Sequence, residues 1–190
     1  MSPDKTQWGD QFEGHLVPPP ISKDDTYFKD VVGVEFVDNK EGIVLKELND
    51  LFEKVGFPKR DLAKLKVALE NTYYLVWIRA AKQTRYARQG QMIGFGRATS
   101  DGALSATIWD VAISPSWQRS GLGRALIERI TARLVQDCIP TITLYAEPNV
   151  VSLYEKLGFM KDPEGIKGMA FQRSKKEGGA ARPRVAAARG

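Results

Sequence analysis

Residues 108–123 of the chain read IWDVAISPSWQRSGLG. This stretch starts inside an apolar, β-branched run that predicts a strand over residues 106–113. Pro115 ends this strand, because proline cannot donate a hydrogen bond to a β-ladder. A loop with two glycines follows, and apolar side chains then recur at every fourth position, as on one face of an amphipathic helix: Leu122, Leu126, Ile130 and Leu134. The stretch therefore predicts a strand, a glycine-rich loop and a helix in direct succession.

The loop between this strand and this helix has the features of an anion-binding site. The first turn of a helix has unpaired N–H groups and the positive end of the helix dipole, and both favour phosphate. Gly121 and Gly123 let the backbone approach a ligand because they have no Cβ, and Arg119 and Arg124 would add positive charge. An ordinary tight turn would have the same residues. The loop matches neither the Walker pattern nor G-x-G-x-x-G.

The segments that follow extend the pattern. A second strand is predicted over residues 141–146, and NVVSLYEKLGF occupies residues 149–159. QRSGLG at residues 118–123, followed by YEKLGF, resembles two motifs of the GNAT family of acetyl-CoA-dependent N-acetyltransferases. In that family the first motif holds the pyrophosphate of coenzyme A, and the second ends a helix after the next strand. The resemblance covers roughly residues 73–171. It is strongest to the plant plastid branch, which includes serotonin N-acetyltransferases and plastid protein acetyltransferases.

The resemblance implies an α/β (α+β) domain with the GNAT fold. Its sheet would be mixed and mostly antiparallel, with six to seven strands, splayed at the central strand pair and covered by helices on both faces. Helical spacing predicts one helix over residues 45–55 and another that begins after Asp61 as its N-cap. Apolar or alternating runs predict the remaining strands, which cover residues 31–37, 73–80, 91–99, 159–161 and 167–171. An antiparallel meander would thus lead into a strand–helix–strand unit.

One domain with two flanking arms is expected. Residues 1–27 predict a flexible leader, residues 28–172 the acetyltransferase domain, and residues 173–190 a basic, disordered tail. The tail holds six basic residues and one acidic residue, so the rest of the chain carries 22 of each sign although the net charge is +5. A domain without a basic excess is not expected to bind nucleic acid. No run of 18 apolar residues occurs, so no membrane span is expected.

The beginning of the sequence, MSPDKTQWGDQF, lacks the apolar segment of a secretory signal. It also lacks the Arg- and Ser-rich, acid-poor composition of a transit peptide. The resemblance implies a plastid location, with the cytoplasm as the alternative. We therefore expect any transit peptide to lie outside this sequence.

Histidine and cysteine are almost absent. His15 is the only histidine and lies in the predicted leader, which excludes Ser-His-Asp and Cys-His catalysis from the domain. A histidine-based zinc site is not expected either, and we predict no metal. Cys138 is the only cysteine, so there is no internal disulfide, and we expect it to be a buried structural thiol. Proton transfer must then run through carboxylates, tyrosine or water.

The resemblance implies acetyl-CoA as cosubstrate and assigns its contacts. The main chain of Val111, Ala112 and Ile113 would bind the pantetheine arm where the central strand separates from the next one at a bulge, and a backbone N–H there would polarise the thioester. From their side chains alone, these residues are simply core. Asn149 would cap the following helix or bind the pantetheine. The pyrophosphate would lie on the loop and the start of the helix: Gln118, Arg119, Ser120, Gly121, Leu122, Gly123 and Arg124.

Three residues are candidates for proton transfer. Tyr154 matches the family tyrosine that protonates the departing thiolate, and a phenol with a pKa of about 10 suits that role. Packing on the sheet is its structural alternative. Asp110, a carboxylate in an apolar run, and Glu147, where the plant relatives usually have aspartate, are candidate bases. Structural carboxylates and a water relay remain open. Thr107 stands where histone-type members have a glutamate base, so that mechanism is not expected.

The acceptor pocket is predicted around Trp109, Asp110 and Glu147. Trp109 would be core or the wall of an aromatic pocket, and Tyr145 and Phe95 are weaker candidates for that wall. The resemblance implies direct acetyl transfer to a primary amine, with an arylalkylamine such as serotonin as the leading acceptor. Lysine or N-terminal amines of proteins come next, and a weakly catalytic CoA-binding interaction protein is a rival from another class. A homodimer is expected from the family.

Overall fold

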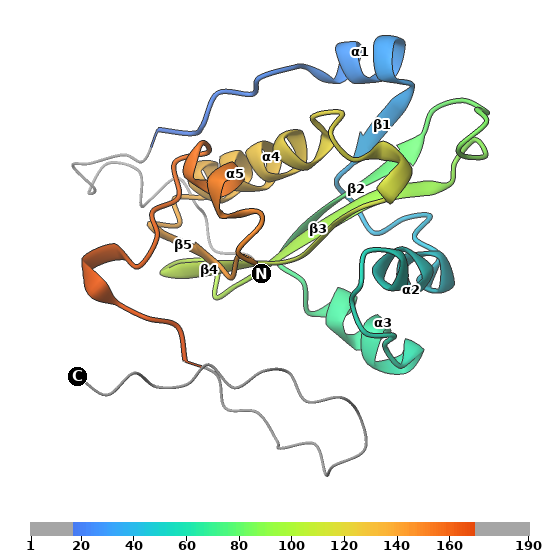
Figure 1. Ribbon diagram of the computed structural model, residues 1–190. Coiled ribbons are helices and arrows are strands. Elements are labelled where there is room, and N and C mark those ends of the chain that lie inside the picture. The colour runs from blue at the N-terminus through green and yellow to red at the C-terminus, as the bar shows by residue number, and fades with distance from the viewer. Residues whose placement is uncertain (1–16, 170–190) are drawn as a thin grey trace.

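The computed structural model describes residues 17–169 of the 190-residue chain. Its centre is a five-stranded sheet with the strand order β1-β2-β3-β4-β5 (Figure 1). The first four strands are antiparallel to their neighbours, and β4 and β5 are parallel. The strands are β1 (Val34–Val37), β2 (Tyr74–Ala80), β3 (Met92–Ser100), β4 (Ser105–Ile113) and β5 (Thr141–Leu144). This mixed sheet confirms the predicted fold class.

Helices cover both faces of the sheet (Figure 1). On one face lies the long helix α4 (Leu122–Gln136), whose apolar side packs into the larger of two core clusters with Leu126, Ile130 and Leu134 fully buried. The short helices α1 (Asp25–Tyr27) and α5 (Val151–Glu155) lie on the same face (Figure 1). On the other face, α2 (Leu45–Lys54) and α3 (Leu62–Glu70) enclose a second cluster around Phe52 and Phe95.

Local side-chain hydrogen bonds mark the start of one helix and one strand, and the predicted N-cap at Asp61 is confirmed. Asp61 caps α3, since its side chain accepts a hydrogen bond from the Lys64 N–H at 3.0 Å. Asp101, in the Asp-Gly turn before β4, accepts hydrogen bonds from the N–H groups of Ala103, Leu104 and Ser105, and these bonds hold the pKa of its carboxyl below the ordinary value. These local side-chain contacts fix where α3 and β4 begin.

The first strand is shorter than predicted. A strand was expected over residues 31–37, but residues Phe28–Val32 form a π-helical turn that Gly33 ends with a φ of +82°. The N–H of Gly33 donates to the Phe28 carbonyl at 2.8 Å. Phe28 is buried edge-to-face against Phe36, whereas Val31 is exposed. Packing of the Phe28 ring therefore overrides the alternating pattern of valines.

The sheet also has fewer strands than the six to seven predicted. Residues 159–161 and the described part of 167–171 form no strand, and residues 170–171 lie outside the described residues. The physical reason lies in the segment itself, because Gly158 turns with a φ of +91° and Pro163 and Gly165 follow. Proline and turn glycines interrupt a β-ladder. Among residues 17–169, the outer edge of β5 has no partner strand.

Three further findings concern the segment up to and including α1, the turn after α4, and the hydrophobicity of the helices. Residues 22–27 contact α4, although they were predicted to be part of the leader: Ser22 bonds Glu128, and Asp25 pairs with Arg129. Cys138 is exposed with a φ of +60° in the turn after α4, so the expectation of a buried thiol was wrong. Among the described residues, no helix combines the length and hydrophobicity needed to cross a membrane.

Candidate functional site

The centre of the candidate site is a gap beside the second half of β4. β4 pairs with β5 only from Ser105↔Thr141 to Ile108↔Leu144, and it continues to Ile113 without a described partner on that side. The sheet is thus splayed at the central pair, as predicted. The main chain of Val111, Ala112 and Ile113 borders this gap.

A β-bulge coincides with the point of separation. Arg97 of β3 faces Trp109, whereas Phe95 faces Ala112, so Asp110 and Val111 together lie opposite Gly96. Asp110 takes a φ of +54°, which is uncommon for a residue with a side chain. The bulge leaves Trp109 and Asp110 on the face of Arg97, because Trp109 is its cross-strand partner and Asp110 bonds to it.

The side chains after the bulge are core, as their sequence suggested. Ala112 is buried in the cluster under α2, while Val111 and Ile113 pack against the cluster under α4. Any ligand role of these residues must therefore involve their N–H and C=O groups. One of those groups is already engaged, since the Gln118 amide donates to the Ile113 carbonyl at 3.1 Å.

The loop after β4 presents a row of free amides. Gly121 is the N-cap of α4 with a φ of +86°, and a Cβ added there would meet nothing within 4 Å. Arg119 also has a positive φ, +62°. Among the described residues, no hydrogen bond is donated by the main-chain N–H groups of residues 119–124, and the first such bond of the helix is from Ala125 to the Gly121 carbonyl. This geometry fits a diphosphate.

The side chains of the loop play unequal parts. Leu122 is buried and anchors the first turn of α4 in the core, so only its amide is available to a ligand. The Ser120 hydroxyl donates to the Trp117 carbonyl and stabilises the loop. Gly123 is half-buried, with Ile113 as the nearest contact for an added Cβ at 3.8 Å. The loop therefore offers mainly backbone and the guanidinium of Arg119.

Arg124 is engaged by a buried carboxylate. Its Nε donates to Glu128 Oε1 at 2.6 Å, and the other Glu128 oxygen accepts from the N–H and hydroxyl of Ser22 at 3.0 and 2.8 Å. Burial raises the pKa of Glu128, but the hydrogen bonds from Arg124 and Ser22 outweigh it and hold that pKa below the ordinary value. Part of the positive charge predicted for the phosphate site is thus balanced within the protein.

Asp110 is not a free carboxylate. Its Oδ1 accepts from Arg60 Nη2 and its Oδ2 from Arg97 Nε, both at 2.7 Å. Only 10% of the Asp110 side chain is exposed. Each of its two oxygens is thus engaged by a guanidinium group. The geometry therefore favours the structural alternative for this predicted base.

Two aromatic rings lie where β4 and β5 part. The rings of Trp109 and Tyr145 stack with centroids 5.4 Å apart and an interplanar angle of 27°. The Trp109 indole donates to Thr99 Oγ1 at 2.8 Å, while Tyr145 remains 65% exposed. Residue 168 passes close by, since a Cβ on Gly168 would lie 2.8 Å from the Tyr145 ring. Phe95, the weaker candidate for an aromatic wall, is fully buried core instead.

The remaining predicted residues belong to the β5–α5 side. Glu147 and Asn149 are exposed in a turn closed by the hydrogen bond from Val150 N–H to the Glu147 carbonyl at 3.0 Å. The Tyr154 ring packs edge-to-face on Phe159 at 6.0 Å, and burial raises the pKa of its hydroxyl. Its hydroxyl has no hydrogen bond to any described residue. A phenol that stays protonated can act as an acid.

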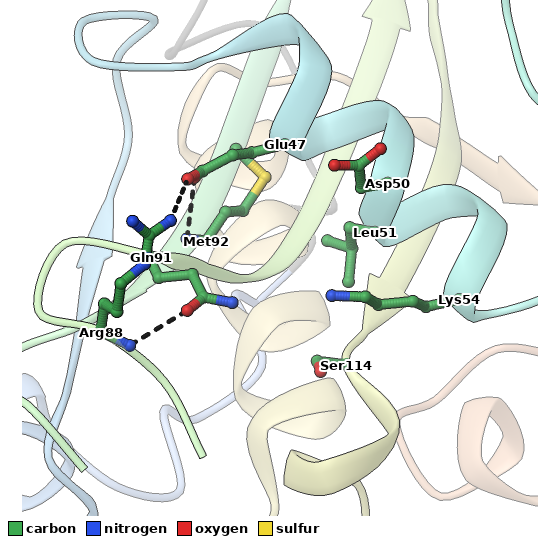
Figure 2. Close-up of a pocket in the computed structure, with 8 residues that line it drawn as sticks. All are labelled: Glu47, Asp50, Leu51, Lys54, Arg88, Gln91, Met92 and Ser114. Carbon is green, nitrogen blue, oxygen red and sulfur yellow. Dashed lines mark hydrogen bonds and ion pairs between the residues drawn. The ribbon is translucent and has the colours of Figure 1, made fainter. Parts of the chain in front are cut away.

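A pocket of about 190 Å³ lies elsewhere, between α2, the β2–β3 loop and the end of β4 (Figure 2). Glu47 lines it and is engaged by Arg88 and by the Met92 N–H (Figure 2). Asp50 and Lys54 line it as well, so its acidic and basic groups balance. No residue predicted for the acetyl-CoA or acceptor site lines this pocket. The candidate site is instead an open strand edge with an adjoining loop.

Arg60 and Arg97 were not predicted from the sequence as partners of Asp110. Arg60 lies 50 positions away in the loop after α2, and no local pattern marks it. Thr107 stands at the position where a glutamate base was not expected. Its hydroxyl shares a hydrogen bond with the Thr143 hydroxyl at 3.0 Å and so connects β4 to β5. Among residues 17–169 there is no group of three or more His, Cys, Asp or Glu side chains suited to a metal ion.

Comparison with known protein families matches one family of domains. The family described as "Acetyltransferase (GNAT) domain" matches residues 72–161, which span the bulge, the loop and Tyr154. A putative acetyltransferase from Deinococcus radiodurans, solved by crystallography, is 28% identical. Its TM-score is 0.60, and the match covers 74% of this chain and 89% of that one.

Two plant proteins show higher identity. GCN5-related N-acetyltransferase 1, chloroplastic, from Arabidopsis thaliana is 47% identical over 139 residues, which are 72% of this chain and 68% of that protein. Serotonin N-acetyltransferase 2, chloroplastic, from Oryza sativa subsp. japonica is 43% identical over 136 residues, or 72% of this chain and 66% of that protein. Both names specify N-acetyl transfer, and only one specifies an acceptor.

Proposed function

Since the chain belongs to the GNAT family of N-acetyltransferases and is thus an acyltransferase, we propose that it transfers acetyl from acetyl-CoA directly to an arylalkylamine such as serotonin. One observation carries the site assignment: the unpaired second half of β4 runs into a loop whose amides at residues 119–124 have no partner among the described residues. An unpaired strand edge that leads into a loop of unbonded amides fits the polarity of a pantetheine arm followed by a pyrophosphate.

In this proposal the main chain holds the cosubstrate. Acetyl-CoA supplies an activated acetyl group as a thioester. The N–H and C=O groups of Val111 and the N–H of Ile113 would align the pantetheine arm along β4, and an N–H at the bulge would polarise the thioester oxygen. Gly121 leaves room for the diphosphate, because the space beside its Cα is open.

The proton-transfer roles fall to the β5–α5 side. Tyr154 is proposed to donate a proton to the departing sulfur. Burial keeps its hydroxyl protonated, and no described residue forms a hydrogen bond with that hydroxyl. Glu147 is proposed to take the amine proton, directly or through water, because its carboxylate is exposed and has no ion pair or hydrogen bond within residues 17–169. A typical general acid or base contributes about a hundredfold or more to the rate.

The aromatic acceptor is supported by the Trp109–Tyr145 stack. An exposed tyrosine ring backed by an indole, on the face of Arg97, offers a flat apolar surface beside the gap. The name of the rice relative points to the same acceptor class. The chloroplastic relatives support a plastid location for this protein.

An amine panel tests the proposal. Purified protein is incubated with acetyl-CoA and serotonin, tryptamine, an aliphatic amine or a lysine peptide, and release of free thiol is followed. We expect the arylalkylamines to give the highest kcat/KM, and Tyr145→Ala to raise their KM about fivefold while it leaves the aliphatic amine unchanged. Preference for the lysine peptide would favour protein acetylation, and absence of turnover with retained coenzyme A binding would favour a binding role.

A further inference from the structure

An ion pair connects the bulge in β4 to the loop that joins α2 and α3. Asp110 lies on β4, Arg97 on β3, and Arg60 in the loop between α2 and α3, so one carboxylate joins three elements. Arg97 also donates from Nη1 to Thr72 Oγ1 at 3.4 Å and is only 15% exposed. Arg97 thus acts from within the sheet, whereas Arg60 acts from outside it.

Arg60 is itself held by its main chain. Asn49 on α2 is buried, and its Nδ2 donates to the Arg60 carbonyl at 2.7 Å while its Oδ1 accepts from the Arg60 N–H at 2.9 Å. The Arg60 guanidinium lies 5.4 Å from the centroid of the Phe52 ring. Its Nε is buried and has no hydrogen-bond partner among the described residues. A planar group held at both ends loses little further freedom when it binds a carboxylate.

Asp110 needs such support because of its backbone. A left-handed conformation costs a residue with a side chain on the order of 1 kcal/mol, although aspartate tolerates it better than most. At this position the conformation creates the bulge, and the bulge decides where the N–H and C=O groups of Val111, Ala112 and Ile113 point. Two short ion pairs to a residue with little exposure offset that cost.

We propose that Arg60 is a positioning residue for acetyl transfer: through Asp110 it holds the bulge of β4 in the form that presents residues 111–113 to the gap beside β5. In this proposal Asp110 stabilises the conformation of β4 and does not act as the base. The effect on turnover rests on the proposed function, whereas the effect on the strand itself does not. The Arg60 guanidinium thus adds an ion pair to the apolar contact that Ala112 already makes with the cluster under the α2–α3 pair.

Amide hydrogen exchange tests the coupling without any assay of activity. The variants are Arg60→Ala and Arg60→Lys in the full chain. Lys59→Ala is the matched control in the same loop, because within residues 17–169 the Lys59 ammonium pairs only with Glu53, at 3.4 Å. We expect amides of residues 109–113 to exchange about tenfold faster in Arg60→Ala, less so in Arg60→Lys, and unchanged in Lys59→Ala. Unchanged exchange at residues 109–113 in folded Arg60→Ala would overturn the proposal. If urea unfolding shows that Arg60→Ala does not fold, Arg60→Lys decides by the same criterion.

Kinetic measurements distinguish a structural role of Asp110 from a role as the general base. Arg60→Ala should lower kcat about ten- to a hundredfold, because small misplacements of reacting groups carry that penalty. Asp110→Asn keeps an acceptor for one arginine and a residue that tolerates a positive φ, so the acid limb of its pH profile of kcat/KM should persist. Loss of that limb in Asp110→Asn would identify Asp110 as the base and contradict the proposal. An unmodified enzyme that acetylates no amine would contradict the proposed function alone, and the exchange result would still decide the role of Arg60.

Discussion

The two walls of the gap in the sheet are held very differently. On the β4 wall, Asp110 has two ion pairs, the Trp109 indole has a hydrogen bond, and Ala112 is buried. On the β5–α5 wall, pairing with β4 covers four residues, α5 is five residues long without a buried member, and Glu147 is exposed. Local stability follows such contacts. Changes in the β4 wall and its loop should therefore affect stability, cofactor affinity and the alignment of the thioester, whereas changes in the other wall should affect turnover with little effect on stability.

The largest expected effect tests the β5–α5 wall. Tyr154→Phe should lower kcat about a hundredfold, the typical contribution of a general acid, while the Kd for acetyl-CoA stays within about twofold. Burial raises the pKa of the Tyr154 hydroxyl above the ordinary value of 10.0, so this hydroxyl should stay protonated up to that pH. Deprotonation of Tyr154 should therefore cause no loss of activity below pH 10.0. Steady-state kinetics and calorimetric titration measure both quantities. A fully active variant would remove the tyrosine from the mechanism.

The second effect concerns the β4 wall and is a loss of stability. Asp110→Ala leaves the guanidinium groups of Arg60 and Arg97 without their carboxylate and should lower the free energy of unfolding by about 2 kcal/mol. This value is below that of a fully buried pair, because 39% of the Arg60 side chain is exposed. Glu147→Ala in the opposite wall should change it by less than about 0.5 kcal/mol. Equal losses in urea unfolding would contradict the difference between the walls.

The third effect isolates the loop that begins α4. Gly121→Ala should weaken acetyl-CoA binding about tenfold, since it strains a φ of +86° and places a methyl group in the open space of the diphosphate cradle. Gly90→Ala is the matched control, because Gly90 has a φ of +79° and equally open surroundings in the β2–β3 loop. We expect both variants to lose similar stability, and only the first to lose affinity in a calorimetric titration. Similar affinities for acetyl-CoA would place the cofactor elsewhere.

The smallest effect is a pH dependence of stability that arises from Glu128 on α4, the partner of Arg124. The pKa of Glu128 is held below its ordinary value of 4.5, so this carboxylate stabilises the fold above that pH and loses the contribution as the pH falls through and below it. Glu128→Gln should therefore be less stable than the unmodified protein near neutral pH, and the difference should shrink in acid. Thermal unfolding at several pH values measures it. A difference that grows in acid would contradict this account.

Most of the fold could be predicted because its signals are local. The strand before Pro115, the apolar stripe from Leu122 to Leu134, and the cap Asp61 each depend on residues within a few positions of one another. The errors arose where distant packing decides. Phe28 and its contact with Phe36 replace the start of the first strand by a π-helical turn. After Gly158, turn residues leave the last predicted strands unformed within the described residues.

The candidate site was predictable in its backbone and less so in its side chains. Gly121 and the splay after Ile108 follow from a motif that serves the main chain. The chemistry of Asp110 could not be inferred, because a carboxylate in an apolar run is compatible with both a base and an ion pair. The distinction depends on Arg60, which is 50 positions away, and on the alignment of β3 with β4, which brings Arg97 beside it.

A crystal structure of the protein with acetyl-CoA would show whether the cofactor lies along β4 and the loop that follows it. We expect a pyrophosphate within hydrogen-bond distance of the main-chain N–H groups of residues 119–124, and a pantetheine arm along residues 111–113 in the gap between β4 and β5. A cofactor bound in the pocket beside α2, or β4 and β5 paired along residues 109–113 so that no gap remains, would contradict this placement.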